Sequence, residues 1–195
     1  MLKTTPMLLE RLSDYAWPAN RLARLVAQGK LTRVVNGLYE TDRNTPGHLL
    51  AGSIYGPSYL SFSWALAFYG LIPEAVHVFT SATFSRKKRK QYTTPFGTFT
   101  YRDVPERVYP LGIRVLQEGK YTFHIASPEK ALCDQLYALP KVHNRKDLLD
   151  LLFEDQRIDT DDFAGLNREL LLFVSARYPC TNVRLLHALL LKGEQ

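Results

Sequence analysis

Side chains that can read nucleic acid recur along residues 17–28 at the spacing of one helix face. Arginine forms paired hydrogen bonds with guanine or with a phosphate, and asparagine and glutamine form them with adenine. Leu22, Leu25 and Val26 follow the i, i+3, i+4 spacing of a buried face. The polar residues that this pattern turns outward are Asn20, Arg21, Arg24 and Gln28. We therefore predict that this helix contacts DNA.

A second group of basic and amide residues follows in a stretch with the pattern of a short hairpin. The sequence GKLTRVVNGLY over residues 29–39 alternates apolar and polar residues, and Asn36-Gly37 is the pair most favoured in a two-residue turn. The alternation predicts that Lys30, Arg33 and Asn36 face solvent. From near the hairpin tip, Arg33 would reach a minor groove or the phosphate backbone.

The elements that carry these residues have the order of a winged helix-turn-helix. Pro18 suits the first turn of a helix and Gly29 the position just beyond its end, so the two residues bound the predicted helix. A short apolar helix over 7–12, a turn, this second helix and the hairpin follow one another in one small unit. Docking of a second helix in the major groove requires this order. The alternative is a solvated surface helix whose arginines have no partner.

The densest block of charge is the run Arg86, Lys87, Lys88, Arg89, Lys90 between two predicted strands. Such runs are commonly exposed loops. In a chain that already carries a DNA-reading unit, the run would add affinity through phosphate contacts without selecting a base sequence. We therefore include these five residues among the candidate DNA contacts.

Residues that could support enzyme chemistry are few. The five histidines are scattered, and the sequence contains no glycine-rich phosphate loop and no cysteine pair with the spacing of zinc ligands. One arrangement offers an alternative function: Asp103, Glu118 and Lys120 are the residue types with which a metal-dependent nuclease holds its ion and polarises a phosphate. We expect a protein that is not an enzyme and that needs no metal or other cofactor.

Composition favours a folded intracellular protein with a polyanionic partner. Of its 195 residues, 46% are apolar, which suffices for a core. Basic and acidic residues number seven and four over 1–45, ten and five over 46–130, and eight and ten over 131–195, so the net charges are +3, +5 and −2. Two widely separated cysteines, no signal sequence and no long apolar run predict a cytoplasmic protein that does not enter a membrane.

The polar segment over 40–46 predicts a boundary between a DNA-binding domain at residues 1–45 and a second domain at residues 46–195. The second domain is expected to begin with short helices over 48–55 and 62–69. Candidate strands follow over 76–81, 98–104, 113–117 and 121–126, and their short connections favour an antiparallel sheet. Helices are expected over 128–139, 145–153, 161–176 and 183–191, each after a capping residue. The expected fold class is α+β, an N-terminal winged helix-turn-helix followed by a mixed domain with an antiparallel sheet and C-terminal helices.

Three blocks of the sequence resemble the AbiEi family, the antitoxins of the AbiE abortive-infection systems, which are type IV toxin–antitoxin systems. The blocks are GKLTRVVNGLY at 29–39, YLSFSWALAFYGL at 59–71 and ASPEKALCDQLY at 126–137. The resemblance implies a winged-helix DNA-binding domain joined to an α+β antitoxin domain. It also implies an autorepressor that binds inverted repeats in its own promoter, needs no cofactor and opposes a nucleotidyltransferase-type toxin in antiviral defence. By position, it assigns the DNA-contacting role to Asn20, Arg21, Arg24, Arg33 and Asn36.

A third hypothesis is a protein-interaction module without DNA binding. The C-terminal third is acidic and rich in leucine, so its helices could bind a toxin or another basic partner. Residues 127–130 of the third block are interpreted as structural, since Ser127 can cap the helix that follows and Glu129 lies near its positive end.

Overall fold

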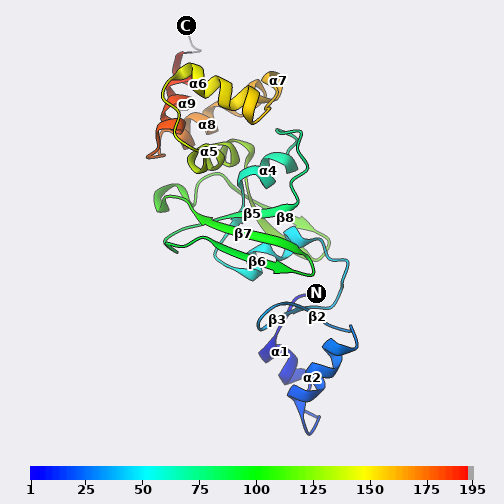
Figure 1. The fold of residues 1–195 in the computed structure, drawn as a ribbon. Helices are drawn as coiled ribbons and strands as arrows, with labels where there is room; N and C mark the ends of the chain where they lie inside the picture. The colour runs from blue at the N-terminus through cyan, green and yellow to red at the C-terminus, as the bar shows by residue number, and fades with distance from the viewer. Residues whose placement is uncertain (193–195) are drawn as a thin grey trace.

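The structure is a computed structural model that describes residues 1–192. A small N-terminal unit lies at one end, a large sheet occupies the middle, and most of the later helices lie at the other end (Figure 1). Helices and a sheet segregated in this way make the fold α+β, as predicted. In chain order the elements are β1 (Lys3–Thr4), α1 (Thr5–Arg11), α2 (Pro18–Ala27), β2 (Thr32–Val35), β3 (Leu38–Glu40), η1 (Gly47–Leu50), α3 (Ala51–Ile54), β4 (Tyr59–Leu60), α4 (Phe62–Phe68), β5 (Val78–Thr83), β6 (Lys90–Thr94), β7 (Gly97–Asp103), η2 (Glu106–Val108), β8 (Ile113–Glu118), β9 (Tyr121–Ala126), α5 (Pro128–Ala138), α6 (Arg145–Asp150), η3 (Leu151–Asp155), α7 (Thr160–Ala164), α8 (Arg168–Ser175) and α9 (Thr181–Lys192).

The N-terminal unit, residues 1–40, contains two helices and a three-stranded sheet. The sheet is antiparallel with the order β1-β3-β2, so a strand that precedes α1 extends the hairpin β2–β3. Leu8 of α1, Leu22 of α2 and Leu31 form a small core of their own. The apolar spacing of α2 therefore predicted its buried face correctly.

Two chain reversals in this unit also follow their sequence signals. Gly29, with a φ of 70°, comes just after the end of α2 in a left-handed conformation that favours glycine. The hairpin turns at Asn36-Gly37, between β2 and β3. The helix and the hairpin are thus joined by only a few residues.

The large sheet is mixed, and the expectation of an antiparallel sheet is wrong. Its strand order is β6-β7-β5-β4-β9-β8, with β7 parallel to β5 and the unexpected short strand β4 parallel to β9. The hairpin β6–β7 joins β5 through its second strand. Phe99 and Tyr101 of β7 are buried, whereas β6 begins with exposed Lys90 and Gln91. Burial therefore favours β7 inside the sheet and the polar strand β6 at its edge.

The helices after the sheet follow most of their capping signals. Ser127 Oγ accepts a hydrogen bond from the Lys130 amide at 3.3 Å and begins α5, as predicted. The single helix expected over 161–176 is instead two helices, α7 and α8. Asn167 lies between them and its Oδ1 accepts a hydrogen bond from the Leu170 amide at 3.0 Å, so a second cap starts a new helix.

The N-terminal sheet packs against the large sheet. Val34 of β2 is only 4% exposed and belongs to the main core, and β2 also contacts β6. Glu40 at the end of β3 is fully buried, and its Oε2 accepts a hydrogen bond from the Tyr121 hydroxyl at 2.7 Å. The hairpin contributes to both cores, so the division at residue 45 stays a prediction.

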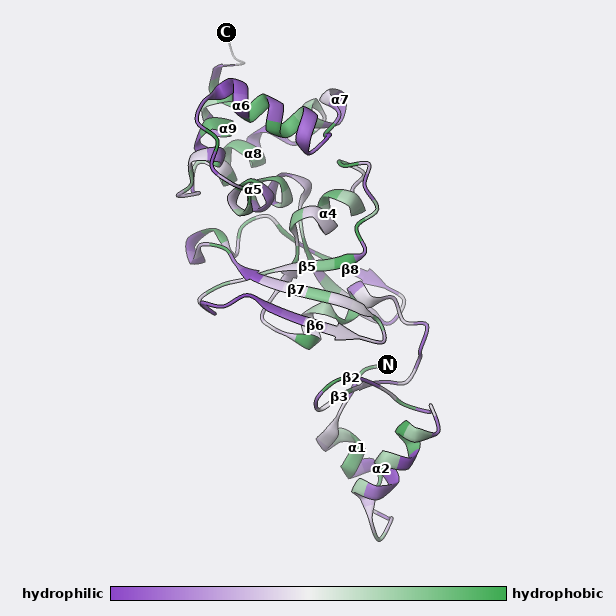
Figure 2. Ribbon diagram, viewed as in Figure 1, coloured by the Kyte–Doolittle hydropathy of each residue, from purple (hydrophilic) through white to green (hydrophobic). Residues whose placement is uncertain are grey.

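A polar network lies inside the main core. Figure 2 shows hydrophobic residues, in green, along the sheet and the helices beside it. Lys130 and Asp134 of α5 are both fully buried, and Lys130 Nζ lies 2.7 Å from Asp134 Oδ1. The Tyr178 hydroxyl donates to the same Asp134 oxygen at 2.5 Å. Two further hydroxyls, of Tyr59 and Ser61, donate to Asp134 Oδ2 at 3.1 and 2.7 Å. The network connects α5 to the β4 region and to the segment after α8.

Candidate nucleic-acid interface

The outward face of α2 carries the first group of predicted contacts. Asn20, Arg24 and Gln28 are exposed, and Lys30 is exposed just beyond the end of the helix. Leu22 on the opposite side is buried against α1, and this packing holds the polar face outward. Donors and acceptors suited to bases and phosphates are therefore free along this face.

Arg21 is less available than the sequence suggests. Its guanidinium carbon lies 5.1 Å from the centre of the Tyr15 ring, and the residue is half-buried. Its Nε is buried without a hydrogen-bond partner among residues 1–192. The contact holds Arg21 near the turn between α1 and α2, so Arg24 is the freer of the two arginines.

The hairpin β2–β3 carries the second group. Arg33 and Asn36 are exposed, and the Arg33 guanidinium donates a hydrogen bond to the Asn36 side-chain oxygen. Val34 points to the other face and is buried against the large sheet. One face of the hairpin is thus fixed, while Arg33 and Asn36 lie beside each other on its free face.

The basic run 86–90 is shaped by a carboxylate from a neighbouring strand. The amides of Arg86 and Lys87 both donate to Asp103 Oδ2 at 2.7 Å. The other oxygen, Oδ1, accepts a hydrogen bond from the Thr83 hydroxyl at 2.6 Å. Asp103 therefore fixes the backbone at the start of the run.

The five side chains of the run do not form one uniform surface. The Arg86 guanidinium carbon lies 5.3 Å from the centre of the Tyr55 ring, so this side chain is held against the protein. Lys87 and Lys88 are exposed. Arg89 directly precedes β6 and its side chain lines a cavity beside this strand, whereas Lys90 is the exposed first residue of β6. Lys87 and Lys88 are therefore free for phosphate contact.

An Asp103→Ala variant is expected to release the loop. The free energy of unfolding should fall by about 1–3 kcal/mol, because hydrogen bonds to a charged acceptor are lost. Exchange of the Arg86 and Lys87 amides should accelerate by roughly tenfold or more, as measured by NMR hydrogen exchange. Asp103→Asn, which keeps one acceptor oxygen, should give an intermediate result. Unchanged exchange in Asp103→Ala would show that other contacts hold the loop.

The residues of the nuclease alternative are not brought together. Asp103 ends β7 and Glu118 ends β8, four strand positions away, which corresponds to about 19 Å across the sheet. Glu118 Oε2 instead lies 2.9 Å from His48 Nε2, and Lys120 Nζ lies over the Tyr121 ring. Within residues 1–192 no group of three or more His, Cys, Asp or Glu could hold a metal ion. The sequence showed suitable residue types but not the strand order that separates them.

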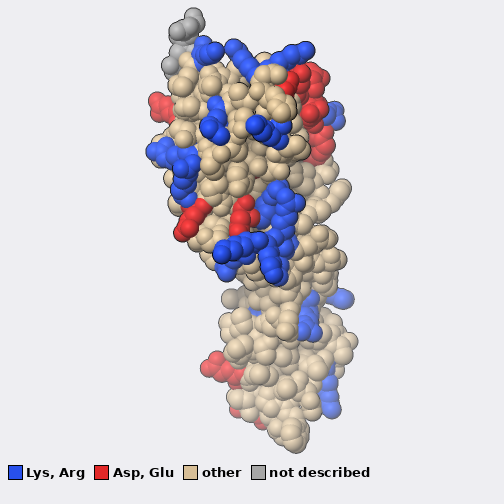
Figure 3. Space-filling model, turned by 60° about the vertical axis from the view of Figure 1, so that its left-hand side comes forward, with Lys and Arg blue, Asp and Glu red and all other residues tan. Residues whose placement is uncertain are grey.

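The basic side chains gather at the level of the large sheet. Figure 3 shows a dense group of Lys and Arg there, with further basic side chains on the N-terminal unit. The positive net charge of residues 1–130 predicted such a bias.

The sequence pattern did not single out two aromatic residues, Tyr15 and Trp17, at the turn before α2. Trp17 is 74% exposed, and Tyr15 is also exposed. Trp17 directly precedes Pro18, the first residue of α2, and so lies at the start of the helix that carries the candidate contacts. The available signal was a tryptophan outside the apolar spacing of both helices. Exposed aromatic residues of this kind mark contact surfaces more often than single exposed aliphatic residues do.

Comparison with protein-family models finds no match to this chain, and comparison with curated proteins finds none either. None of the helices within residues 1–192 is long and apolar enough to cross a lipid bilayer. Functional inference therefore depends on the geometry of the surfaces and on the sequence blocks.

Proposed function

We propose that the protein is a DNA-binding antitoxin that represses transcription of its own type IV toxin–antitoxin operon. The observation that carries the proposal is the exposed group formed by Asn20 and Arg24 of α2 and Gln28 just after it, next to a hairpin on which Arg33 is exposed. A helix with such a face and an adjoining hairpin are the parts of a winged helix-turn-helix, which inserts the helix in the major groove. The operon and the toxin are inferred from the resemblance of three sequence blocks to AbiEi antitoxins.

The contacts divide into those that read sequence and those that add affinity. Arg24 and Asn20 reach base edges from α2, since arginine pairs with guanine and asparagine with adenine. Arg33 and Asn36 contact the backbone or the minor groove beside the helix. Lys87 and Lys88 of the basic run contact phosphates and select no sequence.

The operator and the toxin follow from the family resemblance. Inverted repeats require two copies of the N-terminal unit, one for each half-site. The toxin is a nucleotidyltransferase, and type IV neutralisation does not require that the antitoxin touch it. Repression and neutralisation are therefore tested separately.

The direct test is binding to the DNA upstream of the chain's own gene. Fluorescence anisotropy at fixed salt should give an affinity about 1,000-fold or more above that for shuffled DNA. A reporter driven by this promoter should be repressed, and co-expression should relieve the growth arrest caused by the neighbouring toxin. Equal affinity for both DNAs would contradict the repressor, and unrelieved arrest would contradict the antitoxin. Complete absence of DNA binding would favour the interaction-module hypothesis.

Replacing Lys87 and Lys88 with alanine is expected to change the salt dependence of binding more than its specificity. The slope of log K against log salt concentration should become shallower by about 2, since each phosphate contact contributes roughly 0.9. The preference for operator over shuffled DNA should stay the same. The matched control replaces Lys141 and Lys146, two exposed lysines near the C-terminal helices. A slope equal to that of the wild type would place the loop away from the DNA.

A further inference from the structure

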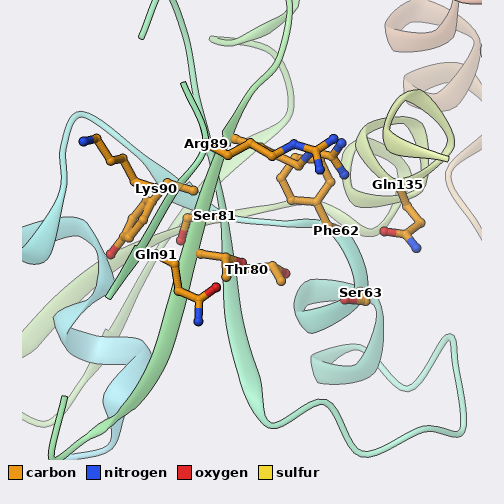
Figure 4. Close-up of a pocket in the computed structure, with 11 residues that line it drawn as sticks. Phe62, Ser63, Thr80, Ser81, Arg89, Lys90, Gln91 and Gln135 are labelled. Atoms are coloured by element: carbon orange, nitrogen blue, oxygen red, sulfur yellow. The ribbon is translucent and has the colours of Figure 1, made fainter. Parts of the chain in front are cut away.

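A polar cavity opens between the edge of the large sheet and helices α4 and α5. Its volume is about 610 Å³, which lies within the range of small-molecule sites. Figure 4 shows residues that line it, among them Arg89, Gln91 and Gln135. Apart from Phe62 and Tyr101, the residues that line it have polar or charged side chains, so a ligand with both a charged group and an apolar face fits it.

The register of the strands explains why these side chains meet. Thr100 of β7 pairs with Gln91 of β6 on one side and with Thr80 of β5 on the other, so all three lie on one face of the sheet. Arg102 and Arg89 lie two residues from Thr100 and Gln91 respectively, and the period of two places them on the same face. Lys90 belongs to the opposite face and points away in Figure 4. Arg89 is thus the member of the basic run whose side chain enters the cavity.

Two positively charged side chains, Arg89 and Arg102, line this cavity. Arg89 extends toward Phe62 in Figure 4, and the Arg102 guanidinium carbon lies 5.5 Å from the centre of the same ring. Burial and the charge of Arg89 lower the pKa of Arg102. No Asp or Glu is among the lining residues that the structure describes, and none of the ion pairs within residues 1–192 includes either arginine. An anion between the guanidinium groups would relieve their repulsion, and paired arginines suit phosphate.

Hydroxyl and amide groups complete the lining. Ser63, Thr100 and Gln91 form no side-chain hydrogen bond with other protein groups in the described part of the chain. The Gln135 amide nitrogen donates to Gln156 Oε1 at 2.8 Å, which fixes its orientation at the wall. Free donors and acceptors therefore surround the charged end of the cavity.

Phe62, which lines the cavity, has a strained backbone conformation. Phe62 has a φ of 57°, in the left-handed region that bulky residues rarely adopt. The preceding residue is fixed on both sides, because the Ser61 amide donates to the Thr80 carbonyl and its hydroxyl to Asp134. Strained residues that surrounding contacts hold in place occur preferentially at ligand sites.

We propose that this cavity binds a small nucleoside phosphate. The phosphate lies between Arg89 and Arg102, and the sugar or base faces Ser63, Thr100 and Gln91. A recess of this volume admits one nucleotide, whereas duplex DNA contacts convex surfaces such as α2 and the loop lysines. The proposal does not depend on DNA binding by the N-terminal unit.

The test is calorimetric titration of the full chain with the four ribonucleoside monophosphates and triphosphates, the corresponding nucleosides and inorganic phosphate. At least one nucleotide is expected to bind about tenfold or more tightly than its nucleoside and than phosphate alone. Arg102→Ala should weaken that binding by about tenfold or more. The matched control is Arg107→Ala, which removes an exposed arginine of η2 outside the cavity. Thr100→Val, which keeps the charge, should weaken binding by severalfold and serves if Arg102→Ala fails to fold.

Three results would overturn the proposal. One is the absence of nucleotide binding by the wild type. Another is binding that Arg102→Ala and Thr100→Val affect no more than Arg107→Ala does. A third is equal affinity for nucleotides and inorganic phosphate, which would reduce the cavity to an anion site. Competition by duplex DNA that disappears in an Arg24→Ala variant would instead show that the nucleotides bind at α2, and this result also counts against the cavity.

Discussion

A double Arg24→Ala, Arg33→Ala variant is expected to bind its operator about 30-fold or more weakly than the wild type. A bidentate contact of Arg24 to a base contributes roughly 1–3 kcal/mol, and a charge-assisted contact of Arg33 to the DNA backbone contributes about 1.5–3 kcal/mol, so together they contribute at least about 2 kcal/mol. Both residues are exposed and neither belongs to a hydrophobic core, so the folded state should be retained. Fluorescence anisotropy at constant salt measures the affinity, and circular dichroism with thermal unfolding measures the fold.

The control for this variant removes the same charge from a distant surface. Arg145→Ala with Lys146→Ala changes two exposed residues of α6 and should bind DNA as the wild type does. The single variants divide the roles, because Arg24→Ala should reduce discrimination between operator and shuffled DNA and Arg33→Ala should weaken both equally. Wild-type affinity in the double variant would remove α2 and the hairpin from the interface.

Local signals predicted the N-terminal unit because its elements are stabilised by neighbours in sequence. Pro18 begins α2, Gly29 follows its end and Asn36-Gly37 turns the hairpin, each through a backbone preference of the residue itself. Leu22 is buried because it lies on the apolar stripe of the helix. These signals did not predict that Val34 packs on the large sheet. This contact fixes one face of the hairpin.

Long-range pairing limited the rest of the prediction. Asp103 looked like a metal ligand by type, but its Oδ2 accepts hydrogen bonds from two backbone amides that precede it by 16 and 17 residues, and its Oδ1 accepts one from the Thr83 hydroxyl. The basic run looked uniform, yet Arg89, just before β6, extends into a cavity, and Lys90, the first residue of β6, points away from it. The contacts of Asp103 follow from the parallel pairing of β7 with β5, whereas short connections had suggested an antiparallel sheet.

The two central blocks of the AbiEi resemblance meet in one buried network. Tyr59 and Ser61 belong to the block at 59–71, Lys130 and Asp134 to the block at 126–137, and their side chains share hydrogen bonds at Asp134. In the sequence, Lys130 and Asp134 have the i, i+4 spacing of an ordinary surface pair. Burial raises the pKa of Tyr178 and of Tyr59, so both hydroxyls stay protonated and donate to the carboxylate at neutral pH. The two blocks therefore form a structural joint, a buried hydrogen-bond network that connects α5, β4 and the C-terminal helices.

A Lys130→Met variant is expected to lower the free energy of unfolding by about 3–5 kcal/mol, because it leaves the Asp134 carboxylate buried without its cation. Methionine matches the length of the lysine stem, so lost packing should contribute little. Urea unfolding monitored by fluorescence measures the change. Lys146→Met, an exposed substitution on α6, should stay within about 0.5 kcal/mol of the wild type.

A second variant separates the charge from the hydrogen bonds of the network. Lys130→Met with Asp134→Leu removes both ions and should recover part of the loss, since an apolar pair avoids an uncompensated buried charge. Recovery should be incomplete, because the hydroxyls of Tyr59, Ser61 and Tyr178 lose their shared acceptor. A double variant less stable than Lys130→Met would mean that these hydroxyl bonds, and not the ion pair, stabilise the joint between the two blocks. Wild-type stability in Lys130→Met would lead to the same conclusion.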